Sequence, residues 1–139
     1  MNQSNYDPEI PLQELTRAEE EVMQILWNLG KGFVNDVLDY FPEPKPAYNT
    51  VSTIIRILEK KGFVSHKAFG KTHQYYPLIS KQEYTRHFMG NIVKGYFDNS
   101  FRKLVTFFSG DANISIKEME DIRRLIDQQI EQKKSKNHE

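Results

Sequence analysis

Residues 47–62 read AYNTVSTIIRILEKKG, and their periodicity predicts a helix with two different faces. Apolar side chains recur at helical spacing on one face, namely Val51, Ile54, Ile55 and Leu58. A second stripe with the same spacing carries amide, hydroxyl and cationic groups, namely Asn49, Ser52, Thr53, Arg56 and Lys60. Such groups suit hydrogen bonding to base edges in the major groove of DNA. Taken alone, the segment is also compatible with an ordinary amphipathic helix that has a solvated polar face.

The segment after this helix predicts a basic β-hairpin. Residues 63–68 form the first predicted strand, residues 69–71 the turn and residues 72–77, THQYYP, the return strand. A helix followed by a basic hairpin is the plan of a winged helix. We expect contacts to DNA phosphates from its cations and from polar groups beside the helix, namely Tyr48, Lys60, Lys67, Lys71 and His73. The alternative is that the lysines at the hairpin tip only keep it soluble.

The residues before this helix predict a helix-turn-helix. Thr16 and Glu19 have the spacing of a capping box, so a first helix is expected over about residues 17–29, and Gly30 ends it. A short second helix is expected over residues 33–41. The prolines at 42, 44 and 46 end it, because proline lacks an amide hydrogen. Two helices joined by a tight break, the second with the polar stripe, match a DNA-binding motif.

Charge is segregated along a chain whose formal net charge is zero. Residues 1–44 carry nine acids and two bases, whereas residues 45–76 carry six lysines and arginines and a single acid, Glu59. The positive region therefore coincides with the predicted helix and hairpin, as expected for a nucleic-acid-binding surface.

The C-terminal part of the chain predicts helices with more apolar surface than they can bury alone. Capping boxes at Ser80 with Glu83 and at Ser115 with Glu118 start two helical segments, with a break near residues 95–100. Seven aromatic residues lie between positions 84 and 108, and each can bury about 150–250 Å². We therefore expect a symmetric dimer whose interface contains Phe88, Ile92, Tyr96, Phe97, Phe101, Leu104, Val105, Phe108, Ile122, Leu125 and Ile126. The alternatives are a monomer folded back on its N-terminal part and a small molecule bound among the aromatics.

These patterns predict a mainly α fold with a small antiparallel β wing. The expected parts are a flexible arm over residues 1–14, a winged helix-turn-helix DNA-binding domain over 15–79, a C-terminal helical dimerisation domain over 80–131 and a polar tail over 132–139. The chain has no cysteine, which excludes disulfides and thiolate metal sites. It has neither a secretory signal nor an apolar run long enough for a membrane span, so we expect a cytoplasmic location.

Three stretches resemble the BlaI/MecI/CopY family of penicillinase and methicillin-resistance repressors: LTRAEEEVMQILW at 15–27, AYNTVSTIIRILEKKGFVSH at 47–66 and GKTHQYYPL at 70–78. The resemblance extends over about residues 12–130. It implies a winged-helix head, a helical dimerisation tail, repression at an operator dyad and a membrane sensor metalloprotease as upstream partner. The recognition-helix positions of the family fall on Asn49, Thr50, Ser52, Thr53 and Arg56.

The resemblance also implies differences from particular branches of the family. Methicillin-type members have Lys where this chain has Asn49 and Arg where it has Ser52, which indicates a different operator sequence. The Asn-Phe bond that is cleaved in the antibiotic-responsive branch aligns with Thr106-Phe107. The copper-responsive branch has a C-terminal cysteine cluster, and this chain has no cysteine.

The leading hypothesis is a dimeric transcriptional repressor on a palindromic operator. A winged-helix protein–protein interaction module without specific DNA binding is the second hypothesis. An enzyme is the third, and the sequence argues against it because it has no Gly-rich phosphate loop, nucleophile motif or metal-ligand cluster. His66 and His73 are expected to face each other across the hairpin. Two imidazoles without a nearby carboxylate make a weak metal site, so we predict neither metal nor cofactor.

Overall fold

The computed structural model of the protein describes residues 12–110 and 113–137. The chain divides between Met89 and Gly90 into two compact units, which are described separately below.

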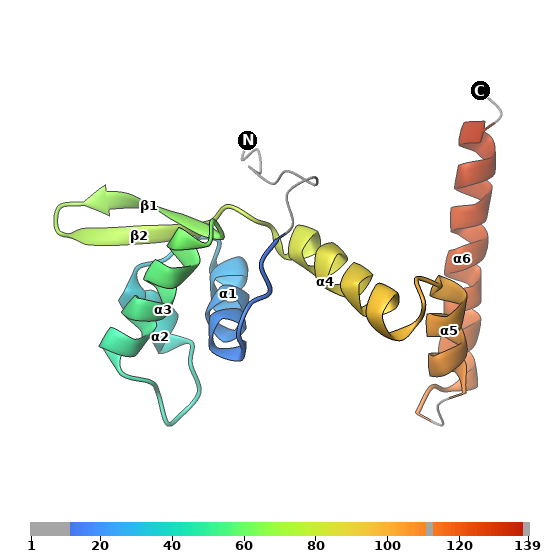
Figure 1. Ribbon diagram of the computed structural model, residues 1–139, viewed down its shortest axis with the longest axis horizontal. Helices are drawn as coiled ribbons and strands as arrows, with labels where there is room; N and C mark the ends of the chain where they lie inside the picture. The colour runs from blue at the N-terminus through green and yellow to red at the C-terminus, as the bar shows by residue number, and fades with distance from the viewer. Residues whose placement is uncertain (1–11, 111–112, 138–139) are drawn as a thin grey trace. The chain divides into compact units, whose positions relative to one another are not determined.

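The N-terminal unit is a winged helix. Its elements are α1 (Arg17–Leu29), α2 (Val34–Asp39), α3 (Tyr48–Lys60), β1 (Val64–Phe69), β2 (Thr72–Pro77) and the first turns of α4 (Lys81–Tyr96). Figure 1 shows the three helices packed together and the antiparallel hairpin extending beside α3. The predicted fold class, mainly helical with a small β wing, is confirmed.

Local sequence signals determine the ends of α1. Thr16 accepts a hydrogen bond from the Glu19 amide at 3.2 Å, and the Glu19 carboxylate accepts one from the Thr16 amide at 2.8 Å. Gly30 has φ +80° and ends the helix. The predicted capping box and glycine stop are both present.

The core of this unit lies between the three helices and the hairpin. Its fully buried side chains include the predicted apolar face of α3, with Ile54 partly buried beside Val51, Ile55 and Leu58. The other fully buried members are Val22, Met23, Leu26, Val37, Phe63 and Val64. Because one face of α3 is buried here, its polar stripe faces outward.

The first strand of the hairpin lies one residue later than predicted, whereas the return strand covers residues 72–77 as predicted. The register pairs Val64 with Pro77 and Phe69 with Thr72, so the turn contains only Gly70 and Lys71. The predicted three-residue turn is wrong because Phe63 is fully buried in the core before the strand begins, and Phe69 takes the last strand position. Gly70 has φ +64°, as the tight turn requires.

The first turns of α4 belong to the winged-helix unit. Tyr84 is buried, its hydroxyl accepts a hydrogen bond from the Leu15 amide at 3.1 Å, and its ring lies near those of Trp27, Phe63 and Phe88. The division of the chain at Met89 therefore lies ten residues beyond the domain boundary expected at residue 79. Phe88, expected in the dimer interface, stacks on Tyr84 with ring centroids 6.1 Å apart.

The C-terminal unit contains the end of α4, α5 (Phe101–Ser109) and α6 (Ile116–Asn137). The predicted break near 95–100 is present, with Asp98 and Asn99 at positive φ between α4 and α5. α6 continues to Asn137, so the predicted polar tail over residues 132–139 is helical through residue 137. Its last turns consist largely of Glu, Gln and Lys, which are strong helix formers, and Lys134 and Lys136 complement the helix dipole. In the described ranges, no helix is both long and apolar enough for a membrane span.

Candidate nucleic-acid interface

The outer face of α3 presents the predicted base-reading side chains. Asn49, Thr50, Thr53 and Arg56 are exposed and Ser52 is half-buried. The Thr53 hydroxyl donates a hydrogen bond to the Asn49 carbonyl at 2.8 Å. Its proton is thus used within the helix, which leaves the methyl group and an oxygen lone pair for a ligand.

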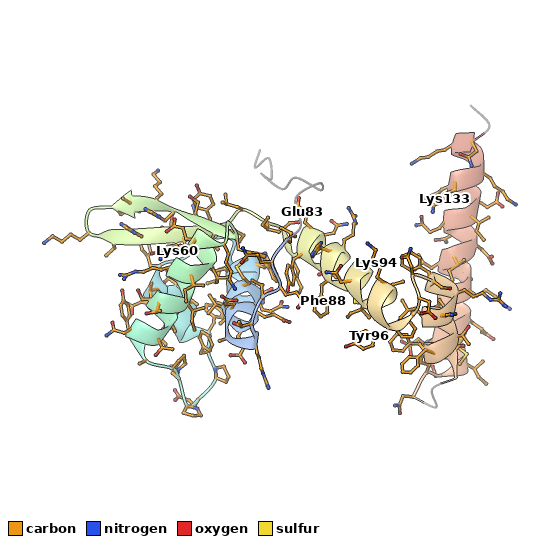
Figure 2. All side chains as sticks on the ribbon, viewed as in Figure 1. Lys60, Glu83, Phe88, Lys94, Tyr96 and Lys133 are labelled. Atoms are coloured by element: carbon orange, nitrogen blue, oxygen red, sulfur yellow. The ribbon has the colours of Figure 1, made fainter. Side chains whose placement is uncertain are left out.

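A cleft of 420 Å³ brings this face of α3 together with the wing. Its lining from α3 consists of Tyr48, Ser52 and Arg56, and the other lining residues include Asp36, Lys71, His73 and Tyr75. Two predicted base-reading residues therefore share one cleft with three predicted phosphate-binding residues. Two other predicted DNA-binding residues lie outside this cleft. Lys60 is at the C-terminal end of α3 (Figure 2), and Thr50 lines a groove formed with α1 and the proline-rich turn.

Aromatic contacts fix the tip of the wing. The Phe69 ring meets the Phe33 ring edge-on with centroids 5.7 Å apart, which holds the hairpin against the start of α2. The Lys67 ammonium lies 5.3 Å above the Phe69 ring. Lys67 is exposed beside an aromatic surface, while Lys71 follows Gly70 in the turn itself.

The rings of the two wing histidines contact each other as expected. A carboxylate that the sequence did not predict also lies beside them. The rings of His66 and His73 stack with centroids 4.0 Å apart, and His66 Nδ1 lies 2.5 Å from Glu59 Oε2. The expectation of no nearby carboxylate was wrong, since α3 brings its last turn against β1 and no local pattern signals that contact. Within residues 12–110 and 113–137, no cluster of three His, Cys, Asp or Glu side chains is suited to a metal ion.

Two cations of the positive region are engaged inside the protein. The Lys45 ammonium donates to the carbonyls of Leu38, Asp39 and Phe41 at 3.2, 2.8 and 3.2 Å. It thereby satisfies carbonyl groups at the end of α2, which covers residues 34–39 and is shorter than the predicted 33–41. Lys61 pairs with Glu19 at 2.7 Å. Neither ammonium is available for DNA in this arrangement.

Glu19 joins α1 to the end of α3. Only 4% of its surface is exposed. Burial alone would raise the pKa of Glu19, but hydrogen bonds from Lys61 and Thr16 outweigh it and hold that pKa below its ordinary value. The ionised carboxylate thus fixes the end of α3 relative to α1.

The C-terminal unit exposes many large apolar side chains. Tyr96 is 82% exposed, Phe101 70% and Leu125 56%. A groove of 480 Å³ between α5 and α6 is lined mainly by Leu104, Val105, Phe108, Ile114, Met119, Ile122 and Ile126. Most of the predicted dimer residues lie on these helices. Ile92 and Phe97 are half-buried, and Tyr96 is the last residue of α4 (Figure 2). Their role in dimerisation stays a prediction.

The predicted cleavage pair lies inside α5. The Thr106 hydroxyl donates to the Arg102 carbonyl at 2.8 Å, and the Phe107 ring lies near those of Phe97 and Phe108.

Comparison with known proteins identifies relatives along most of the chain. The family model described as penicillinase repressor matches residues 15–128. The methicillin resistance regulatory protein MecI of Staphylococcus aureus (strain N315) is 29% identical over 114 residues, which is 81% of this chain and 93% of that protein. The penicillinase repressor of Bacillus licheniformis is 21% identical over 124 residues, covering 88% of this chain and 97% of that protein.

A solved structure is also similar. The solution structure of the DNA-binding domain of the repressor BlaI matches at 27% identity with a TM-score of 0.46, over 52% of this chain and 90% of that chain.

Proposed function

This chain belongs to the penicillinase repressor family of DNA-binding transcriptional repressors, and on that premise we propose that it acts as a dimer on a twofold-symmetric operator. The observation that carries the proposal is the cleft in which the polar face of α3 and the cations of the wing meet. Members of the family are repressors, and the chain is accordingly no enzyme.

In this proposal α3 reads bases and the wing binds the DNA backbone. Arg56 suits the acceptor pair of guanine and Asn49 suits adenine, while Ser52, Thr53 and Thr50 contact bases or the thymine methyl. Tyr48, Lys60, Lys67, Lys71 and His73 bind phosphates, which fixes the register without reading sequence. The support is geometric, because all ten side chains lie on α3 or the wing that flanks it.

The proposed partner for the C-terminal unit is a second copy of the chain. Two reading heads match two half-sites one or more helical turns apart. The exposed apolar surface of α5 and α6 supports this, since a single copy leaves it in water. We place the protein in the cytoplasm, with the DNA it reads.

We further propose that a membrane sensor metalloprotease relieves repression by cleaving the chain. The Thr106–Phe107 bond lies within a helix, and the Thr106 carbonyl accepts a hydrogen bond from the Gly110 amide at 3.3 Å. Cleavage there therefore requires α5 to unwind. Mass spectrometry of the protein after exposure of its host to a β-lactam would detect the two fragments, and an intact chain in derepressed cells would contradict this part.

The proposal is tested by a salt titration of binding to DNA from the chain's own upstream region, with a random duplex as control. We expect tight binding to one dyad, two chains per site, and a steep fall in affinity with salt. Equal and weak binding to both duplexes would contradict the proposal and favour the protein–protein interaction module.

A further inference from the structure

We infer that Glu59 is a positioning residue for DNA binding, which acts through His66 to hold the imidazole of His73 in place for the DNA backbone. The inference rests on the proposed function, because it takes His73 as a phosphate ligand. Glu59 is the single acid among residues 45–76, and a carboxylate on a surface that binds DNA repels the phosphates. A role in positioning accounts for an acid at this place.

Glu59 lies in the last turn of α3 and contacts His66 of β1. Glu59 Oε2 lies 2.5 Å from His66 Nδ1, and 31% of the Glu59 side chain and 33% of the His66 side chain are exposed. A carboxylate only accepts hydrogen bonds, so Nδ1 carries the hydrogen and donates it. A hydrogen bond to a charged group is shorter and stronger than a neutral one. This bond ties the His66 ring to the helix that carries the predicted base-reading residues.

The His66 ring in turn supports the His73 ring. The register pairs His66 with Tyr75 and Ala68 with His73, so the two histidines are diagonal neighbours on one face of the hairpin. Their rings stack with centroids 4.0 Å apart and planes inclined by 6°. The buried Tyr75 ring lies 5.7 Å from the His66 ring and 6.2 Å from the His73 ring. The His73 ring therefore packs against two neighbouring rings, one of which is held by α3.

The supported His73 ring lies at the candidate interface. His73 is exposed, and it lines the 420 Å³ cleft together with Arg56 and Lys71. Stacking uses the face of an imidazole, whereas its nitrogens lie on the edge and suit a hydrogen bond to a phosphate oxygen. A side chain loses rotamer entropy when DNA fixes it, and a ring that is already held loses less. The contacts from Glu59 to His66 and from His66 to His73 therefore preorganise one phosphate contact.

Two uncharged substitutions of Glu59 in the full-length protein separate positioning from charge. Glu59→Gln keeps a side-chain oxygen that accepts the Nδ1 hydrogen, whereas Glu59→Met removes that acceptor at nearly the same length. If only charge matters, both variants bind DNA equally, and slightly more tightly than the wild type. We expect the Glu59→Gln variant to bind the operator and a random duplex about threefold to tenfold more tightly than the Glu59→Met variant, the range of one hydrogen bond. Equal affinities of the two variants would overturn the inference.

A double-mutant cycle tests whether Glu59 acts through His73. Glutamine and methionine both suit a helix, so both variants should remain folded, which thermal unfolding checks. In a His73→Ala background the two Glu59 variants should bind DNA equally, and a difference that persists there would overturn the inference. His73→Ala alone should weaken binding to both duplexes by about threefold to tenfold. If it has no effect, the inference and the phosphate role of His73 fail together, whereas the proposed repressor function fails only if the wild type does not prefer the operator to the random duplex.

Discussion

Arg56 and Lys71 line the same cleft, yet we expect different roles for them. Arg56→Ala should weaken the free energy of operator binding by about 1–3 kcal/mol through one base-pair position, because a guanine would lose its hydrogen-bond donors. Lys71→Ala should weaken binding to all sequences alike and reduce the salt slope by about one, because one phosphate would lose its cation. Affinities for the operator, its single-position variants and a random duplex distinguish the two. Uniform losses for both variants would contradict the assignment of Arg56.

The Glu19–Lys61 pair should contribute stability that depends on pH. The folded-state pKa of Glu19 lies below its ordinary value of 4.5, so this stability is present above the unfolded pKa and is lost as pH falls through the folded pKa. Lys61→Met leaves a buried carboxylate without its cation and should lower the free energy of unfolding at neutral pH by about 1–3 kcal/mol.

Urea unfolding of the Lys61→Met variant from neutral to acidic pH measures this loss. Lys60→Met is the matched control, because Lys60 is exposed on the neighbouring position. The difference in free energy of unfolding between the Lys61→Met variant and the wild type should become smaller as pH falls. A difference in free energy of unfolding that does not change with pH would show that Lys61 stabilises the fold through packing alone.

At the scale of the elements, two glycines should respond in opposite directions to the same substitution. A Cβ at Gly70 or Gly90 would meet no atom within 4 Å, so neither substitution is opposed by packing. Gly70 has φ +64° in the wing turn, and Gly70→Ala should destabilise by about 1 kcal/mol. Gly90 lies within α4, and Gly90→Ala should stabilise by up to about 1 kcal/mol, the difference in helix propensity.

Thermal unfolding of the two alanine variants measures the effect of each substitution. Destabilisation by Gly90→Ala would indicate that α4 needs freedom at this position.

The elements with strong local signals were predictable from the sequence. Thr16 with Glu19 and Gly30 set both ends of α1, and the spacing of apolar residues identified the buried face of α3. The end of α2 and the wing turn were not predictable, because contacts outside each segment determine them. Lys45 caps α2 from the following loop, and the core takes Phe63 out of the strand.

The candidate site was predictable for the residues on the outer face of α3 and not for those that support them. Periodicity alone indicates that Arg56 is exposed, because it lies opposite the apolar stripe. Glu59 becomes relevant only when β1 and the last turn of α3 meet in space.

At the scale of the whole molecule, the apolar surface of the C-terminal unit should control both assembly and DNA affinity. Leu125→Asp places a charge on a surface that we expect to be buried between two copies. We expect a monomer and a loss of operator affinity of about 100-fold or more, because each head then binds alone. Sedimentation and operator binding measure the two effects.

Gln128→Asp is the matched control, because it adds the same charge to α6 outside the apolar set. It should remain dimeric. A dimeric Leu125→Asp variant would contradict the proposed interface, and a monomer with full operator affinity would contradict the need for two heads.

Glu19 has a consequence for how sequences of this kind can diverge. One carboxylate accepts the Thr16 amide at the start of α1 and the Lys61 ammonium at the end of α3. Loss of either partner alone leaves a buried charge less satisfied, whereas joint replacement by apolar residues removes the charge. In related sequences, positions 19 and 61 should therefore be inherited as a pair. A chain that has lost the cation at 61 should have lost the acid at 19 too.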